Sequence, residues 1–411
     1  MRSRQHLQTG SVDAGPSPSP IRKYQMTTHF ARGMTKATEL TKAGKLTEAT
    51  ALIQSLLSDK TPETTSLPDN TVIEGEFTPL DGTNRADTTK PAPVPRGTKQ
   101  PRASLRETLR KIAAGGMPGH ARMPKPRVPV PDGAEFVTMT HRAAGDQRDY
   151  KLYIPANRPS AAMPLIVMLH GCTQSPDDFA AGTGMNALAE QHGFLVAYPA
   201  QPNAANANKC WNWFKAEDQG RDRGEPALIA GLTRDIVRDY PVDKGRIFVA
   251  GLSAGGATAA IMGAAYPDLF SAVGVHSGLA IGAATDIPQA FSAMRSGSSG
   301  KLSVKTVPTI VFHGLADVTV HPRNGDAVTA QALSSLGGLK GVLSRGKSEG
   351  GRSYRKTRYA DQNGCTMCEH WEIDGAGHAW AGGHSEGSYT DPIGPSASQE
   401  MLRFFMQHVR R

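Results

Sequence analysis

The sequence predicts a three-layer α/β domain with a mostly parallel sheet over residues 133–411 of the 411-residue chain. From about residue 134 onward, short runs rich in β-branched and aromatic residues alternate with longer segments of helical periodicity. Two of these runs, residues 165–169 and 246–250, are almost continuously apolar, which is typical of strands covered on both faces. No stretch approaches the roughly 18 consecutive apolar residues of a membrane-spanning helix, so a transmembrane protein is excluded.

The N-terminal third has a different character. Residues 1–26 are polar and contain three prolines, and we expect them to be disordered. Apolar residues at three- and four-residue steps predict a helical hairpin at 27–59, interpreted as a small docking element. Residues 60–132 hold 12 of the 29 prolines and are expected to be a basic linker, because they cannot bury enough apolar area to offset their ordering entropy. No apolar core follows the basic start, so a signal peptide is not expected.

The net charge of +9 is confined to this N-terminal third. Residues 1–130 contain 20 basic and 11 acidic residues, whereas the remainder contains 26 of each. The basic stretch lacks the aromatic residues that stack on bases, so nucleic acid is not expected as a partner. Association of residues 1–130 with an anionic surface or a granule is the alternative that the charge leaves open.

Strands and helices are assigned to the predicted domain from periodicity and from the Gly, Pro, Asn and Asp residues between segments. The predicted strands are residues 135–140, 150–154, 165–169, 194–198, 246–250, 272–276, 309–312 and 369–373. The predicted helices are residues 177–191, 227–239, 254–265, 327–336 and 398–408. This alternation is the pattern of a sheet covered by helices on its faces.

The segment GLSAG at residues 251–255 is the strongest local signal. It directly follows the predicted strand 246–250 and opens a helix of small residues, which is the strand–turn–helix setting of a nucleophile elbow. The turn is so sharp that side chains flanking Ser253 would collide, which explains Gly251 and Gly255. The helix N-terminus favours developing negative charge at this serine. A glycine-rich turn that only packs a helix on a strand is the alternative.

A serine hydroxyl needs a base, and in this setting an acid and then a histidine are expected later in the chain. Asp317 comes just after the predicted strand 309–312, and His378 follows the predicted strand 369–373 through a Gly-rich turn. We expect His378 to take the proton from Ser253, while Asp317 holds the tautomer of His378 and stabilises its imidazolium.

Other residues compete for the same two roles. Asp374 is the alternative acid, because it also lies near His378 in the sequence. His313, His276 and His384 are alternative bases, although we expect His313 to support the Asp317 loop instead. Asp317 and His378 rank first because they fit the expected chain order, whereas Asp374 directly follows its strand and precedes a glycine turn. His276 and His384 lack the glycine-rich approach.

Two backbone amides are expected to bind the oxyanion of an acyl-transfer reaction. One is the amide of Ala254, directly after the nucleophile, and the other is the amide of Cys172, in the loop after the predicted strand 165–169. Gly171 allows the backbone to approach closely, while His170 and Gln174 are expected to hold this loop rather than react.

The four cysteines form two groups. Cys172 and Cys210 both lie in loops on the predicted active-site side, and we expect a disulfide between them in protein made under oxidising conditions. Cys365 and Cys368 have a metal-like or redox-like spacing, but a single C-x-x-C without a second pair is weak evidence for zinc. We therefore expect no metal site and no cofactor.

Five motifs, taken together and in this order, resemble the polyhydroxybutyrate depolymerase-type esterase family. They are HGCTQ at 170–174, CWNWF at 210–214, GLSAG at 251–255, GHAWAGG at 377–383 and DPIGPSAS at 391–398. The resemblance covers about residues 134–411. It implies an α/β-hydrolase fold and a serine esterase of poly(3-hydroxyalkanoates) or their oligomers, with Ser253, Asp317 and His378 as catalytic triad.

The resemblance also implies candidate substrate contacts and alternatives. Trp211, Trp213 and Trp380 are candidate walls of the acyl and alcohol subsites, with packing in the core as the equal alternative. Such families also include feruloyl and acetylxylan esterases, which are the alternative function, and a non-catalytic binding protein is a weaker one. The family resemblance implies an extracellular location, while the missing leader leaves the cytoplasm as the alternative.

Removal of residues 1–130 should leave the hydrolysis of small soluble esters nearly unchanged. All predicted catalytic groups lie between Cys172 and His378, and the removed segment supplies no predicted strand to their sheet. The same removal should weaken salt-sensitive association with anionic surfaces, because it takes away the whole excess charge. Rates on a soluble ester and binding at several salt concentrations check both statements. A truncated protein that folds but has lost turnover would contradict the domain boundary.

Overall fold

The computed structural model describes residues 126, 128–143, 146–298, 305, 307–334, 336 and 339–410. The chain divides into two units, Met1–Gln100 and Pro101–Arg411, and all described residues lie in the second. The predicted hairpin at 27–59 and nearly all of the predicted linker at 60–132 lie outside the described residues.

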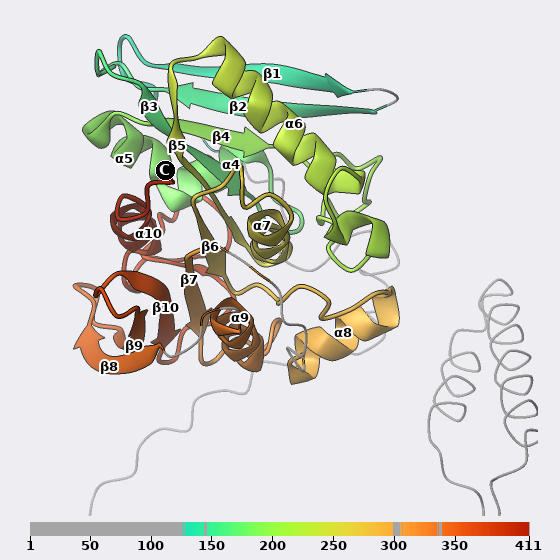
Figure 1. Ribbon diagram of the computed structural model, residues 1–411, viewed down its shortest axis with the longest axis vertical. Coiled ribbons are helices and arrows are strands. Elements are labelled where there is room, and N and C mark those ends of the chain that lie inside the picture. Colours follow the sequence, from blue (N-terminus) through green and yellow to red (C-terminus); the bar gives the residue numbers. More distant parts are fainter. Residues whose placement is uncertain are drawn as a thin grey trace, which may run out of the picture. The chain divides into compact units, whose positions relative to one another are not determined.

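A ten-stranded sheet runs through the described part of the chain (Figure 1). Its central strands β4, β3, β5, β6, β7 and β10 are parallel, while β1, β2, β8 and β9 extend its two edges through antiparallel pairs. In spatial order the strands are β1 (Glu135–Ala143), β2 (Asp146–Ile154), β4 (Leu195–Pro199), β3 (Met163–Leu169), β5 (Val242–Leu252), β6 (Ala272–His276), β7 (Thr309–Gly314), β10 (Thr366–Ile373), β9 (Ser353–Ala360) and β8 (Lys340–Lys347). The predicted α/β class with a mostly parallel sheet is confirmed.

Helices cover both faces of this sheet (Figure 1). One face packs against α6 (Gly224–Asp239), α7 (Ala254–Ala265), α8 (Ile287–Ser296) and α9 (Arg323–Leu333). The other packs against α4 (Pro176–Thr183), α5 (Met185–His192) and α10 (Ala397–Phe405). Alternate residues of β3, β4, β5, β6 and β7 enter the two cores: Val249 points to the first, whereas Phe248 points to the second and stacks on Phe405. The remaining short elements are η1 (Ala216–Gln219), β11 (Trp380–Ala381) and β12 (Thr390–Asp391).

The predicted elements agree with the observed ones where local pattern is strong. The strand at 272–276 and the helix at 254–265 have the predicted bounds, and every other predicted strand forms, with ends that differ by up to four residues. The single helix predicted at 177–191 was wrong. Gly184 has a φ of 62° there, so it ends α4 and begins α5.

Several elements were not predicted, among them the two strands of the β8–β9 hairpin and helix α8. The β8–β9 hairpin lies at the edge of the sheet, and its eight-residue strand β8 is exposed at nearly every position, so its sequence lacks an apolar period. Helix α8 has only Ala290 and Ala293 buried, although Asp286 caps its first turn by accepting from the amide of Gln289. The capping Asp followed by Pro was the signal available for α8.

None of the helices in the described residues is both long enough and apolar enough to cross a membrane.

Phe248→Ala should lower the free energy of unfolding by about 3–5 kcal/mol, because it empties a fully buried position between β5 and α10. Phe291→Ala on α8 is the matched control, since that ring is 59% exposed and its loss should change the free energy by no more than about 0.5 kcal/mol. Urea unfolding of both variants makes the comparison. Equal losses would show that the two-core arrangement is wrong.

Candidate active site

Ser253 forms the turn between β5 and α7. Its φ of 58° and ψ of −120° lie in a strained region that residues with a Cβ rarely adopt. The Ser253 amide donates to the carbonyl of His276 at 2.9 Å, which ties the turn to the neighbouring strand β6. The serine is 8% exposed, at the carboxyl edge of the parallel strands.

The glycines around Ser253 are required by close packing. A Cβ at Gly255 would lie closer than 3.0 Å to the Leu169 carbonyl oxygen, and a Cβ at Gly251 would lie equally close to the backbone of Gly255. Real Cβ atoms do not show such separations. The predicted collision of flanking side chains is therefore confirmed, and it involves the end of β3 as well as the turn itself.

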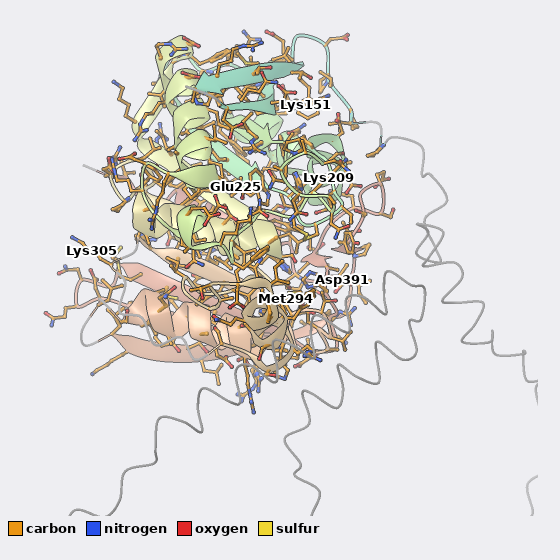
Figure 2. All side chains as sticks on the ribbon, turned by 90° about the vertical axis from the view of Figure 1, so that its right-hand side faces the viewer. Lys151, Lys209, Glu225, Met294, Lys305 and Asp391 are labelled. Carbon is orange, nitrogen blue, oxygen red and sulfur yellow. A yellow bond between two sulfur atoms is a disulfide. The ribbon has the colours of Figure 1, made fainter. Side chains whose placement is uncertain are left out.

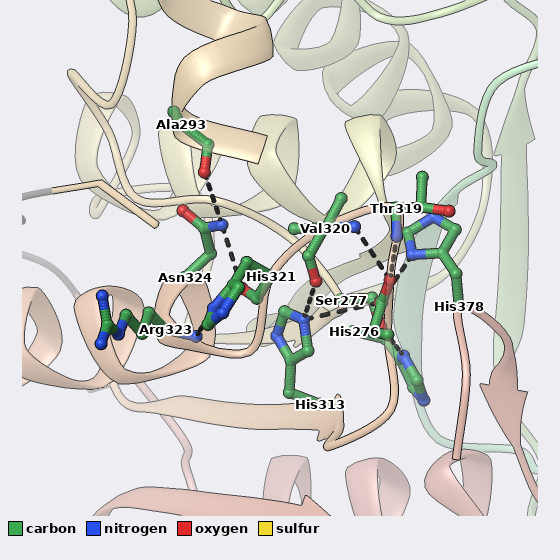
Figure 3. Close-up of polar contacts among 11 residues, drawn as sticks. His276, Ser277, Ala293, His313, Thr319, Val320, His321, Arg323, Asn324 and His378 are labelled. Carbon is green, nitrogen blue, oxygen red and sulfur yellow. Dashed lines mark hydrogen bonds and ion pairs between the residues drawn. The ribbon is translucent and has the colours of Figure 1, made fainter. Parts of the chain in front are cut away.

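Asp317 and His378 are joined by a hydrogen bond of 2.7 Å between Asp317 Oδ2 and His378 Nδ1. Asp317 is 4% exposed, and its other oxygen accepts from the amides of Thr319 and Val320 at 2.9 and 2.8 Å (Figure 3). The competing acid Asp374 is exposed and makes no hydrogen bond to His378. Of the two acids that the sequence offered, Asp317 is the one that contacts the histidine.

The environment keeps Asp317 ionised. Burial alone would raise its pKa, but hydrogen bonds from His313, His378 and the Val320 amide outweigh burial and hold the pKa well below its usual range. A carboxylate in this state can orient His378 and stabilise a positive charge on its ring.

The register of the sheet aligns the strand ends that precede these residues. Leu252 of β5 pairs with His276 of β6, His276 pairs with Phe312 of β7, and Phe312 pairs with Trp371 of β10. The loops carrying Ser253, Asp317 and His378 therefore leave the same edge of the sheet. No hydrogen bond joins Ser253 to His378 in this structure, which describes both residues; catalytic hydrogen bonds often tighten only when substrate is bound.

The loop after β3 lies beside the Ser253 turn. Leu169 pairs with Gly251 across β3 and β5, and the loop carries Cys172, which forms a disulfide with Cys210. The expected disulfide is thus confirmed. The amides of Cys172 and Ala254 donate to no other described residue, and Ala254 is the first residue of α7. Both amides therefore remain available for an incoming oxygen.

Buried polar groups hold the Cys172 loop in place. His170 contacts the Gly171 carbonyl through Nδ1 at 2.7 Å and accepts from the Gln201 amide at Nε2. Gln174 accepts from the Gly171 amide at 2.8 Å. Burial lowers the pKa of His170 to about 4, so its ring is neutral at pH 7. These contacts agree with the expected holding role of His170 and Gln174.

The three tryptophans proposed as subsite walls are almost fully buried. Trp211 and Trp380 are 0% and 1% exposed, and Trp213 is 6% exposed. Trp211 donates from Nε1 to the His170 carbonyl at 3.0 Å, and Trp380 donates to Ser398 Oγ at the same distance. Two of the rings therefore support site loops here, and subsite contact by the three stays a prediction.

Glu225, in the first turn of α6, was missed by sequence reasoning. It is buried, and it accepts from Gln201 Nε2 and from both the amide and the side chain of Asn212. Burial and the neighbouring Asp218 raise the pKa of Glu225. Glu225 is labelled in Figure 2. Gln201 and Asn212 in turn contact or flank Cys210, so the Glu225 carboxylate supports the loop that the disulfide joins to Cys172. The sequence signal available for Glu225 was Asn212, inside the CWNWF motif.

No group of three or more His, Cys, Asp or Glu side chains within the described ranges is arranged to hold a metal ion. Cys365 is exposed and Cys368 is buried, and the two form no disulfide.

Comparison with known proteins gives a family match. Residues 148–353, half of the chain, match the family described as esterase PHB depolymerase. The matched segment includes Ser253, Asp317 and Cys172, and it ends before His378.

The individual relatives differ in the substrates that their names state. Poly(3-hydroxyalkanoate) depolymerase C of Paucimonas lemoignei is 33% identical over 242 residues, which are 55% of this chain and 57% of that protein. Feruloyl esterase B of Neurospora crassa is 28% identical over 279 residues, which are 62% of this chain and 86% of that protein. The chain thus spans little more than half the length of the depolymerase.

A solved structure with the same fold is the acetyl xylan esterase of Aspergillus awamori. It superposes with a TM-score of 0.51 at 20% identity, covering 67% of this chain and 99% of that one. The superposition supports the assignment of the sheet and its helices to an α/β-hydrolase fold.

Gly255→Ala should prevent the native turn from forming, because its Cβ would overlap the Leu169 carbonyl. We expect little soluble folded protein, or a loss above about 3 kcal/mol of unfolding free energy. Gly377→Ala is the control, since a Cβ there would have no described atom within 4 Å. Expression yield and thermal unfolding separate the two variants, and a stable Gly255→Ala protein would refute the packing argument.

Proposed function

The chain belongs to the esterase PHB depolymerase family, and from this premise we propose that it is a serine esterase. Its proposed substrates are poly(3-hydroxyalkanoates), among them poly(3-hydroxybutyrate), or short oligomers of hydroxy acids. The observation that carries the proposal is the hydrogen bond between His378 and the buried Asp317, at the sheet edge where Ser253 occupies its strained turn.

In the proposed reaction, Ser253 Oγ attacks the ester carbonyl while His378 Nε2 accepts its proton. The amides of Cys172 and Ala254 stabilise the oxyanion of the tetrahedral intermediate. His378 then protonates the departing alcohol, which leaves an acyl-enzyme on Ser253. A water molecule, deprotonated by His378, cleaves this ester and releases the acid. Asp317 keeps the His378 Nδ1 proton in place and stabilises the imidazolium in each step.

Substrate class is inferred from the relatives. The Paucimonas lemoignei relative is a poly(3-hydroxyalkanoate) depolymerase, which favours esters of hydroxy acids. The alternative is a feruloyl or acetylxylan-type esterase, and a specific observation favours it: the alignment covers 86% of the Neurospora crassa feruloyl esterase. Trp213, which keeps 6% exposure, is the tryptophan that we propose to line the acyl or alcohol subsite, with Trp211 and Trp380 behind the loops.

An ester panel on purified full-length protein tests the function. The panel contains poly(3-hydroxybutyrate), its oligomers, short- and long-chain nitrophenyl esters and methyl ferulate. We expect turnover of the hydroxybutyrate oligomers and of the short-chain nitrophenyl esters. Turnover confined to methyl ferulate would select the alternative, and no hydrolysis of any ester would refute the proposed enzyme.

Ser253→Ala should lower ester turnover by roughly 10⁴-fold or more while the fold is retained, because only the nucleophile is lost. His378→Ala should cost about as much, since the two residues act as a unit. Ser271→Ala is the control. Ser271 is a buried serine directly before β6, at the end of the strand away from Ser253, so this variant should keep normal ester turnover. Initial rates and melting temperatures are compared, and near-normal turnover of Ser253→Ala would remove the serine from the mechanism.

Asp317→Asn should lower turnover by roughly 10³–10⁴-fold, because the amide stabilises the wrong tautomer of His378. Asp374→Asn should have little effect, since Asp374 is exposed and is not bonded to the ring. Both variants carry the same Asp-to-Asn change, so their kcat values can be compared directly. The opposite ranking would transfer the acid role to Asp374.

A further inference from the structure

The buried histidine His313 contacts the turn that carries Asp317, and the proposed mechanism gives His313 no role. His313 is the penultimate residue of β7 and is 1% exposed. It lies 3.5 Å through Nε2 from Asp317 Oδ2, the same carboxylate oxygen that His378 Nδ1 contacts at 2.7 Å.

The proton of His313 is fixed by its partner on the Asp317 turn. Nε2 lies 2.8 Å from the carbonyl oxygen of Val320, which can only accept, so Nε2 must donate (Figure 3). The Val320 amide donates back to Asp317 Oδ1 at 2.8 Å. The Nε2–H group of His313 therefore donates to Val320, the last residue of the 317–320 turn. The same nitrogen also lies near the Asp317 carboxylate.

The opposite side of the ring is closely packed. A Cβ added at Gly325, in the first turn of α9, would lie 2.9 Å from His313 Nδ1 and 3.1 Å from His370 Nε2. Both of these nitrogens are buried without a hydrogen-bond partner among the described residues. His370 lies on β10, and its Nδ1 is 4.0 Å from Oδ1 of Asp326, the residue after Gly325 in α9. Gly325 therefore leaves space for the ring of His313 in its present position, and a side chain at residue 325 would displace the ring.

We propose that His313 is a positioning residue for the Asp317–His378 pair, packed between the Asp317 turn and Gly325 of α9. The inference rests on the proposed esterase function and extends it. The Nε2 proton keeps the 317–320 turn closed, so that Asp317 Oδ2 stays aimed at His378 Nδ1 and the opposite ring nitrogen stays aimed at the substrate side. This alignment matters most when charge develops on His378, so loss of His313 should lower kcat more than it raises KM.

The test compares full-length variants that differ in the donor at this position. His313→Leu removes the N–H. His313→Gln replaces it with an amide N–H of similar reach, and Gly325→Ala displaces the ring without removing its proton. His408→Leu is the matched control. His408 is also a buried histidine with one ring nitrogen that has no partner among the described residues, and it lies beside Phe404 of α10. The measurements are kcat and KM on a short-chain nitrophenyl ester, the melting temperature, and the low-field proton NMR signal of the His378 Nδ1–H bonded to Asp317.

The expected result has three parts. His313→Leu and Gly325→Ala lower kcat roughly 10- to 100-fold with a much smaller change in KM, and they lose the low-field signal to solvent exchange. His313→Gln recovers most of kcat and keeps the signal. His408→Leu keeps the kcat and the signal of the unmodified protein, whatever its melting temperature.

Two results would overturn the proposal: a folded His313→Leu protein with normal kcat and signal, or a His313→Gln protein as impaired as His313→Leu. If His313→Leu does not fold, normal kcat and signal in Gly325→Ala overturn it equally. If the unmodified protein hydrolyses no ester, the proposed function fails by itself. The NMR comparison then still decides the role of His313, since it needs no substrate.

Discussion

The strained turn at Ser253 is the constraint on which the rest of the site depends. A non-glycine residue with a φ of 58° persists only when its surroundings hold it there. Here the holding groups are the end of β3, packed against Gly255, and the His276 carbonyl, which accepts from the Ser253 amide. The central parallel strands must therefore end in register, because the turn uses backbone groups from the strands on both sides of β5.

Buried histidines anchor three of the loops at this edge. His170 at the end of β3 accepts from the Gln201 amide, His276 at the end of β6 accepts from the Ala381 amide, and His313 on β7 donates to the Val320 carbonyl. Burial lowers the pKa of His170 to about 4 and of His276 to about 3, so both rings stay neutral and keep an acceptor nitrogen. Imidazole suits this task because one ring offers both a donor and an acceptor without a buried charge.

The two sides of the site are supported by different chemistry. On the Cys172 side, a disulfide links the Cys172 loop to Cys210, and the buried carboxylate of Glu225 accepts from Asn212 in the same segment as Cys210. On the Asp317 side, backbone amides and His313 hold the carboxylate, and β10 supplies His378 from the next strand. The β8–β9 hairpin extends the sheet beyond β10, and its strand β9 pairs with β10.

Local patterns in the sequence determined the fold class, most strands and the identity of Ser253, Asp317 and His378 as candidates. These features are local: apolar runs mark buried strands, and a serine between close glycines marks a sharp turn. The sequence ranked Asp317 above Asp374 as the acid without excluding Asp374. Asn212 in the CWNWF motif was its one signal for Glu225, and it held none for Gly325.

Only the tertiary structure decided among such alternatives, because the decision depends on which strand ends meet across the sheet. Asp374 follows β10 directly and points to solvent, whereas Asp317 reaches the His378 ring from β7. The break of the 177–191 helix at Gly184, the hairpin at the sheet edge and the burial of Trp211 likewise follow from packing between segments far apart in the chain. Periodicity reports which face of a segment is buried, but not what it is buried against.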